Sequence, residues 1–321
     1  MMLTDILILI LGLALIIAGA EWLVDGASAI ARKLRVSEFV IGLTIVGFGT
    51  SCPELVVSLT GAFAGNSDIS IGNVIGSNIF NTLLILGVTA LVAPVAITRS
   101  NRLRDIPVTL LVTILLIACG FSHTLFGLGQ ADMLTRVEGI VFLVLFAVYI
   151  FYCFKNDDGS SQQEDKQEKE IKTFIAILLT LAGLAGLIFG GRWFVNSAVR
   201  IASALGVSDK FIAITLLAGG TSLPELAACI VAAARKKGQL ALGNILGSNI
   251  FNILLILGAS AIVSPISLKG ISIVDMAALL ASIVLVWLSS YTFKKNTIDR
   301  YEGAIFVLCF AAYYVWLFIN L

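Results

Sequence analysis

Charged residues are scarce in this chain of 321 residues, because Asp, Glu, Lys and Arg together make up only 13% of it. Soluble domains carry about 25% charged residues, whereas 59% of this sequence is hydrophobic. The composition therefore excludes an ordinary soluble domain and indicates an integral membrane protein. The chain also lacks a basic surface, since its net charge is +1 and no basic cluster exceeds three residues. This balance argues against a nucleic-acid partner.

Histidine and cysteine are scarce as well. The one histidine, His123, is expected in an exposed loop. The five cysteines lie in apolar runs without metal-ligand spacing, so we expect small buried hydrophobic residues. No pair of these residue types is available for a transition-metal site. No His or Lys lies in an apolar segment near Ser51 or Ser222, and no HExxH motif occurs, which disfavours an intramembrane enzyme.

The dominant feature of the sequence is an internal duplication. Residues 49–54 read Gly-Thr-Ser-Cys-Pro-Glu, and residues 72–81 read Gly-Asn-Val-Ile-Gly-Ser-Asn-Ile-Phe-Asn. A constant shift of 171 positions places 49–94 on 220–265 without a gap, with 23 identities in 46 positions. Both patterns recur in the second copy, so the chain consists of two related halves.

The apolar segments predict an all-α polytopic membrane protein. A membrane-spanning helix needs about 20 apolar residues. Ten such helices are expected, at 3–20, 38–64, 71–93, 106–121, 137–154, 172–190, 209–234, 242–263, 272–290 and 303–320. The second and seventh contain Gly-Thr-Ser-x-Pro-Glu and are long enough to be bent or broken. The expected domains are a first five-helix repeat at 1–154 with its duplicated region at about 38–93, a polar linker at 155–171, and a second repeat at 172–321 with its duplicated region at about 209–264.

The basic residues set the expected orientation. The loops after the odd-numbered spans hold 16 of the 21 Lys and Arg residues. By the positive-inside rule, these loops and the linker are cytoplasmic and both termini are extracytoplasmic, in the cell inner (plasma) membrane. Because each repeat has five spans, the second enters the membrane with opposite polarity, and such inverted repeats are typical of alternating-access transporters. The acids of the linker lack calcium-loop spacing, which favours a solvated hinge over a regulatory calcium site.

The duplicated motifs predict a cation site. Each copy places one glutamate, Glu54 or Glu225, inside an apolar segment, where a charge is costly and usually functional. The proline before each glutamate has no N–H, so it leaves a carbonyl of the preceding turn without its helical partner. Ser77 and Asn81 lie four residues apart, and so on one helical face, and the second copy repeats them. Carboxylates, amides, hydroxyls and carbonyls are the oxygen ligands that Ca²⁺ prefers, and no cofactor is expected.

Together these residues resemble a known family. Gly-Thr-Ser-x-Pro-Glu followed by Gly-Ser-Asn-x-x-Asn, duplicated in inverted halves, resembles the α-repeats of the sodium/calcium exchanger family, within the cation/Ca²⁺ antiporter superfamily. The resemblance covers all ten expected spans, and the compact linker is similar to that of prokaryotic members. It implies a sodium/calcium antiporter, not an enzyme, that exchanges Na⁺ for Ca²⁺ by alternating access. Spans 1 and 6 would slide against the core, and glycines such as Gly12 and Gly19 are expected to ease that sliding.

The resemblance also implies a set of ligands. Glu54 and Glu225 would be the central ligands shared by Ca²⁺ and Na⁺, completed by Asn81 and Asn252. The other implied ligands are the carbonyls of Thr50 and Thr221, the hydroxyls of Ser51 and Ser222, the sodium-site residues Ser77 and Ser248, and the backbone carbonyls of Gly47 and Ala218. The potassium-dependent branch and the archaeal exchanger of known fold carry Asp where this chain has Asn252. From that difference we expect no K⁺ requirement.

Two other transport functions stay open at this point. A proton/calcium antiporter would use the same glutamates as proton carriers, although exchangers of that type usually show Gly-Asn-x-x-Glu in their repeats. A cation channel is disfavoured by the inverted repeat, which a channel does not need. The expected partners are Ca²⁺ and Na⁺ as substrates and the lipid bilayer, and nothing in the sequence indicates an obligatory protein partner.

Overall fold

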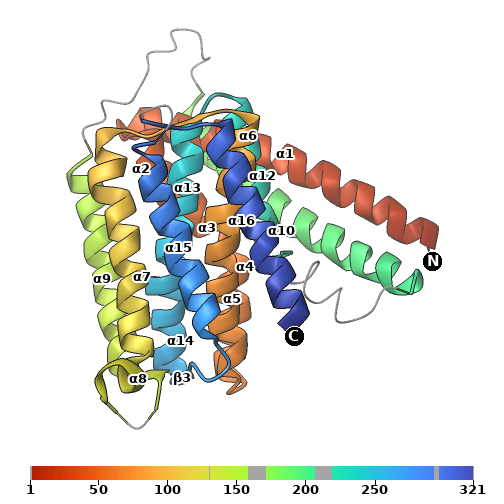
Figure 1. The fold of residues 1–321 in the computed structure, drawn as a ribbon. Coiled ribbons are helices and arrows are strands. Elements are labelled where there is room, and N and C mark those ends of the chain that lie inside the picture. The colour runs from red at the N-terminus through yellow and green to blue at the C-terminus, as the bar shows by residue number, and fades with distance from the viewer. Residues whose placement is uncertain (1, 130, 158–170, 207–218, 293–295, 321) are drawn as a thin grey trace.

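The computed structural model describes residues 2–129, 131–157, 171–206, 219–292 and 296–320. These residues form a bundle of helices with short strands at helix ends (Figure 1). The first half contains α1 (Met2–Leu34), α2 (Glu38–Ile41), η1 (Gly42–Val46), α3 (Gly47–Thr50), α4 (Cys52–Phe63), α5 (Ser67–Ile79), η2 (Phe80–Ile85), α6 (Leu86–Val92), β1 (Val95–Ala96), η3 (Asn101–Asp105), α7 (Ile106–Gly120), α8 (Ser122–Phe126), β2 (Met133–Leu134) and α9 (Arg136–Lys155). The second half contains α10 (Thr173–Ala204), α12 (Leu223–Ala234), α13 (Gly238–Ile250), η5 (Phe251–Leu257), α14 (Gly258–Val263), β3 (Ile266–Ser267), α15 (Ile273–Ser289), β4 (Thr297–Ile298) and α16 (Arg300–Asn320).

Seven helical spans among the described residues are long and apolar enough to cross a membrane, and a bent pair raises the number to eight. The protein is therefore an integral, all-helical membrane protein. Of the predicted span 209–234, only α12 is described, since 207–218 lie outside the described residues. The predicted span 272–290 is a shorter apolar helix, α15, with 17 residues. The count of ten thus stays a prediction.

The predicted span 38–64 is broken, as its motif indicated. The helices on either side of Ser51 meet at an angle of 49°. Ser51 itself leaves the helical conformation, with φ −82° and ψ 5°. Pro53 stands in the first turn of α4, where a missing N–H removes no helical hydrogen bond. The break therefore places the start of a helix, with its free amides, in the middle of the span.

Several turns of the bundle are π-helical, which the sequence did not predict. In these segments, η1, η2, η3 and η5 among the described residues, each carbonyl bonds the amide five residues later. η2 begins at Phe80 and η5 at Phe251, two positions related by the shift of 171. The widened turn is therefore part of the duplication. It contains Asn81 in one half and Asn252 in the other.

The motif-bearing spans lie at the centre of the bundle. The most apolar window is 78% buried in the span 67–92 and 83% buried in the span 238–263, against 17% for both α1 and α16. Gly243 and Gly247 let α13 approach α2 and η1, since a Cβ added at either would lie 2.1 Å from the Phe39 carbonyl oxygen or 2.3 Å from that of Leu43. These glycines therefore allow close backbone contact, whereas a Cβ added at the equivalent Gly72 or Gly76 would meet nothing within 4 Å among the described residues.

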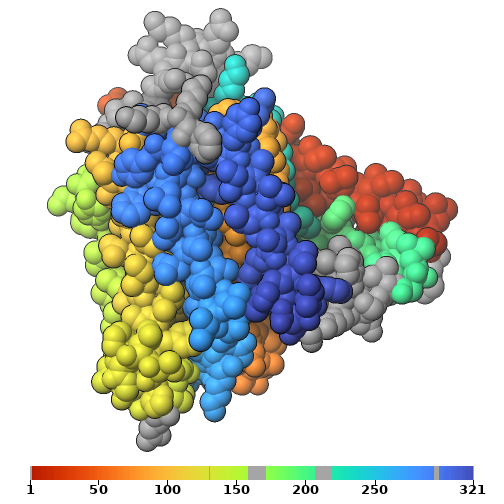
Figure 2. Space-filling view, viewed as in Figure 1, coloured from red at the N-terminus to blue at the C-terminus, as the bar shows by residue number. Residues whose placement is uncertain are grey.

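α1 and α10 run side by side and project from the body of the bundle (Figure 1, Figure 2). Both are longer than predicted, because α1 continues beyond position 20 to Leu34 and α10 beyond position 190 to Ala204. A Cβ added at Gly12 or Gly19 would lie 2.8 Å from a backbone nitrogen of α10. These glycines therefore hold α1 and α10 against each other, a different role from the expected easing of movement against the core.

Two antiparallel strand pairs join the halves of the chain. β1 pairs with β4, with Val95 opposite Ile298, and β2 pairs with β3, with Leu134 opposite Ile266. In each pair, one strand follows a central span of one half and the other precedes the last span of the other half. The halves are thus connected by main-chain hydrogen bonds as well as by side-chain packing.

The residues expected to lie away from the site are mostly where the sequence placed them. His123 is exposed in α8. Glu138 closes a capping box at the start of α9, and Glu302 accepts hydrogen bonds at the start of α16. All five cysteines are free thiols. The expectation that all are buried is wrong for Cys52, Cys119 and Cys309, which are partly exposed, although Cys119 and Cys309 still pack against the core.

Candidate cation-binding site

The two glutamates occupy equivalent places in the two halves. Glu54 lies in the first turn of α4 and Glu225 in the first turn of α12, and each is only 1% exposed. A carboxylate in this position is stabilised by the positive end of the helix dipole and by the free amides of the first turn. The helix start beside each glutamate is thus what makes two buried carboxylates tolerable at the centre of the bundle.

The serines that precede the two helices link the halves crosswise. Ser51 Oγ donates to Glu225 Oε1 at 3.0 Å, and Ser222 Oγ donates to Glu54 Oε1 at 2.9 Å. The shift of 171 converts one bond into the other. Neither serine caps its own helix, although each stands at the N-cap position where a serine usually does so. The predicted residues 51, 54, 222 and 225 are therefore brought together in one cluster.

Several buried side-chain oxygens of the duplicated motifs have no hydrogen-bond partner within the described part of the chain. They are Glu54 Oε2, Glu225 Oε2, Asn81 Oδ1, Asn252 Oδ1 and Ser248 Oγ. Leaving one such group unpaired costs about 1–3 kcal/mol, and more when it is charged. Buried polar atoms are otherwise almost always paired. Unpaired carboxylate, amide and hydroxyl oxygens are the ligand types that a hard cation such as Ca²⁺ or Na⁺ requires.

The remaining predicted ligands lie around the cluster. Ser77 is buried, and its Oγ lies 3.4 Å from Ser222 Oγ. Thr50 is buried, and the Thr221 hydroxyl oxygen is buried without a partner among the described residues. The Gly47 carbonyl accepts the Ser51 amide at 3.1 Å, and the Thr50 hydroxyl lies 3.5 Å from the same oxygen. Ala218 lies outside the described residues.

Four asparagines that the sequence did not single out complete the surroundings of the cluster. Asn73 donates to the Glu54 carbonyl oxygen at 3.2 Å, and Asn244 accepts from the Thr50 hydroxyl at 3.2 Å. A second set joins each π-helical segment to an α-helix of the other half: Asn78 of α5 accepts from Asn252 Nδ2 of η5 at 2.8 Å, and Asn249 of α13 donates to Thr82 Oγ1 of η2 at 2.7 Å. Each of these asparagines is repeated at the equivalent position of the other copy of the motif, and this repetition could have identified them from the sequence.

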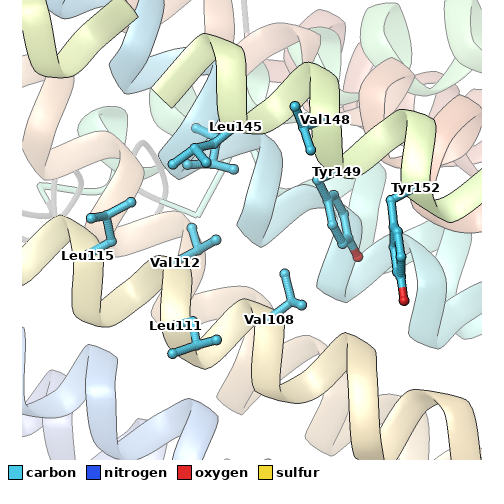
Figure 3. Close-up of a pocket in the computed structure, with 9 residues that line it drawn as sticks. Val108, Leu111, Val112, Leu115, Leu145, Val148, Tyr149 and Tyr152 are labelled. Atoms are coloured by element: carbon cyan, nitrogen blue, oxygen red, sulfur yellow. The ribbon is translucent and has the colours of Figure 1, made fainter. Parts of the chain in front are cut away.

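A cavity of about 430 Å³ lies elsewhere, between α7 and α9 (Figure 3). Its walls are aliphatic side chains of the two helices together with Tyr149 and Tyr152, and Leu254 of η5 also lines it. None of its lining residues is charged. This cavity therefore offers no carboxylate to a cation, and the candidate site is the cluster around Glu54 and Glu225.

Comparison with known proteins agrees with this geometry. Residues 4–155 and 175–319 match the family model described as sodium/calcium exchanger protein. The chain is 40% identical over 332 residues to the putative antiporter CaxA of Alkalimonas amylolytica, covering 99% of each chain. It is 34% identical over 350 residues to the sodium/calcium exchanger MaX1 of Methanosarcina acetivorans, again covering 99% of each chain.

Solved structures give the same result. The sodium-calcium exchanger NCX_Mj, in a crystal soaked with Na⁺ and no Ca²⁺, superimposes with a TM-score of 0.84 over 100% of both chains at 34% sequence identity. Fold and sequence agree over the whole length. The chain therefore belongs to the sodium/calcium exchanger family of cation/Ca²⁺ antiporters.

Proposed function

We propose that this protein exchanges Na⁺ for Ca²⁺ across the membrane by alternating access, without a requirement for K⁺. The observation that carries the proposal is the pair of buried carboxylates, each held by a serine of the other half and each left with one unpaired oxygen. Two negative charges balance one Ca²⁺ or two Na⁺. The two ions would therefore compete for the same oxygens, which is the condition for exchange.

Each predicted ligand receives a role in this proposal. Glu54 and Glu225 bind either ion through their unpaired oxygens, and the amide oxygens of Asn81 and Asn252 complete the central site. Ser51 and Ser222 hold the carboxylates in place and contribute hydroxyl oxygens. The outer contributors are Ser77 and Ser248 for Na⁺, with the carbonyls of Thr50, Thr221, Gly47 and Ala218.

The choice of Na⁺ as the coupling ion is supported by the relatives. MaX1 is named as a sodium/calcium exchanger, and NCX_Mj is described in the same terms. The independence from K⁺ rests on Asn252, a neutral amide at the position where the potassium-dependent branch carries Asp. Without that third carboxylate, the site has no further negative charge with which to balance a K⁺ ion.

We also propose ten membrane spans arranged as two inverted repeats of five. The linker 155–171 would lie in the cytoplasm and both termini outside, in the inner membrane of the cell. The distribution of basic residues supports this orientation, since 16 of 21 lie in loops assigned to the cytoplasmic side. An inverted repeat places the shared site near the middle of the bilayer, where both halves contribute to it.

The test is uptake of ⁴⁵Ca²⁺ by proteoliposomes under defined gradients. Vesicles loaded with Na⁺ and diluted into medium free of Na⁺ and K⁺ are expected to take up Ca²⁺, and added K⁺ should leave the rate unchanged. Uptake that ignores Na⁺ and follows a pH gradient would assign the protein to the proton-coupled branch instead. Uptake that stops when K⁺ is removed would contradict the proposed independence from K⁺.

A further inference from the structure

The two halves of the site share some hydrogen bonds and differ in others. The Ser51–Glu225 bond and the Ser222–Glu54 bond are mirror images under the shift of 171, and both are formed. The amide of Asn73 donates to Ser58 Oγ at 2.9 Å, and that of its counterpart Asn244 donates to the equivalent atom, Cys229 Sγ, at 3.2 Å. These pairs show that the two halves follow the same plan.

The first difference concerns the threonines of the two motifs. Thr50 Oγ1 lies 3.2 Å from Asn244 Oδ1, in a contact that crosses between the halves, and 3.1 Å from the Val46 carbonyl oxygen in its own half, so one hydroxyl proton serves two acceptors. The mirror bond would join Thr221 to Asn73. Within the residues that the structure describes, Thr221 Oγ1 is buried without a partner. Asn73 instead donates to the Glu54 carbonyl oxygen at 3.2 Å, so its amide is engaged within its own half.

The second difference concerns the asparagines at the π-helical segments. Asn252 Nδ2 donates to Asn78 Oδ1 at 2.8 Å, again between the halves. Its mirror bond would join Asn81 to Asn249. Asn249 Oδ1, the acceptor of that bond, is buried and unpaired among the described residues. In both cases the bond is formed on one side, and an equivalent atom on the other side is left without a partner.

Symmetry gives these differences a meaning. Consider two similar halves that enter a membrane with opposite polarity. When the first half adopts one conformation and the second half adopts another, the site between them opens to one face of the membrane. Exchanging the two conformations gives the same molecule open to the opposite face. A hydrogen bond that obeys the symmetry, such as Ser51–Glu225, persists through the exchange. A bond that breaks the symmetry has to move to its mirror position.

We propose that Thr50–Asn244 and Asn78–Asn252 are specific to one access state and are exchanged for Thr221–Asn73 and Asn249–Asn81 in the other. Asn73, Asn78, Asn244 and Asn249 are then positioning residues that brace one half of the site at a time. This rests on the proposed alternating-access function and on the inverted repeat. The buried, unpaired oxygens of Thr221 and Asn249 are the groups that the second state satisfies.

The matched variants Thr50→Val and Thr221→Val test this exchange of hydrogen bonds. Valine keeps the shape of threonine and the backbone carbonyl but removes the hydroxyl. In proteoliposomes of uniform orientation, the KM for Ca²⁺ is measured at each face, and the ratio of the two values reports the balance of the states. Each variant should move this ratio by about two- to tenfold, as expected for one lost hydrogen bond. The two variants should move it in opposite directions, and Thr→Ser at either position should restore it.

If both variants shift the KM ratio equally in the same direction, or neither shifts it, the proposed swap of hydrogen bonds is wrong. The proposed transport of Na⁺ against Ca²⁺ would not be affected by that result. Hydrogen–deuterium exchange of the purified protein provides a readout that needs no transport. Thr50→Val should speed amide exchange at 42–50 and slow it at 219–222, and Thr221→Val should do the reverse. If the two variants do not change the amide exchange rates in opposite directions, the proposed swap of hydrogen bonds is wrong, whether or not Ca²⁺ flux is seen. If the wild type carries no Ca²⁺, only the proposed function fails.

Discussion

At the scale of residues, the most informative feature is the pair of serine hydroxyls that reach across the molecule. An N-cap serine usually accepts the amide of its own helix and stabilises that helix. Ser51 and Ser222 instead donate to Glu225 and Glu54, so each fixes one oxygen of a carboxylate and leaves the other oxygen unpaired. The two carboxylates are thereby held in fixed orientations.

Replacing either serine by alanine should weaken Ca²⁺ binding. The variants Ser51→Ala and Ser222→Ala each lose the donor to one carboxylate, which is then free to rotate. Loss of a partner that orients a metal ligand typically lowers affinity about 10- to 100-fold. Because the two bonds are related by the internal repeat, the two variants should lose similar amounts. The measurement is Ca²⁺ affinity by calorimetry on the purified protein.

Ser282→Ala is the matched control for these variants. Ser282 is as well buried as Ser51, and its hydroxyl donates to the Leu279 carbonyl oxygen at 2.7 Å in α15. Its removal should leave Ca²⁺ affinity near that of the wild type. Unchanged affinity in Ser51→Ala or Ser222→Ala would contradict the role assigned to the crossed bonds.

The sequence singled out the two glutamates more readily than the polar residues that surround them. A glutamate in an apolar segment is conspicuous, and its duplication pointed to Glu54 and Glu225. Asn73 and Asn78 are duplicated just as strictly, yet an asparagine in a helix carries no charge that demands explanation. Their contacts depend on which helix faces which, since Asn73 donates to the Glu54 carbonyl oxygen of a neighbouring helix in its own half and Asn78 donates to the Asn249 carbonyl oxygen of the other half.

At the scale of elements, α1 and α10 form a pair held by backbone contact. Gly183 shows how close the helices are, since a Cβ added there would lie 2.5 Å from the Leu23 nitrogen. Small residues allow such contact in a bilayer, where helices associate through packing. We infer that α1 and α10 move as one unit, and that any sliding takes place between this unit and the rest of the bundle.

Gly19→Leu should separate the pair. A Cβ at this position would lie 2.8 Å from the Leu187 nitrogen, so a leucine forces the backbones apart. Overpacking of this kind typically costs about 1–3 kcal/mol. The melting temperature of the detergent-solubilised protein should therefore fall. Ala14→Leu in the same helix is the control, because Ala14 is exposed and an added side chain there meets lipid.

A melting temperature in Gly19→Leu equal to that in Ala14→Leu would show that the backbones of α1 and α10 are not in contact. The same result would remove the reason for treating the two helices as one unit.

Hydropathy predicted where most helices lie but not how they end or widen. The predicted first span stopped at position 20, before Glu21 and Asp25, since charges interrupt an apolar run. The helix continues past them, and both acids form ion pairs with Arg235 at the end of α12, a partner more than 200 positions away. The π-helical turns of η2 and η5 escaped prediction for a similar reason. Their sequences suit an ordinary helix, and the widening depends on packing in the bundle centre.

At the scale of the whole molecule, the two halves cannot form the site separately. Each carboxylate takes its hydrogen bond from the other half, and each short strand pairs with a strand of the other half. The candidate site therefore lies where the two repeats meet, as expected if an ion is released to either face by movement of one half against the other.

The most direct test of this account is Na⁺-driven ⁴⁵Ca²⁺ uptake by Glu54→Gln and Glu225→Gln. Glutamine keeps the size of the side chain but removes the negative charge, so one carboxylate remains to balance a divalent ion. Glu138→Gln is the control, since this glutamate closes a capping box at the start of α9, where glutamine also serves. We predict no measurable uptake for either site variant and uptake close to wild type for the control. Sustained uptake in Glu54→Gln or Glu225→Gln would contradict the central claim.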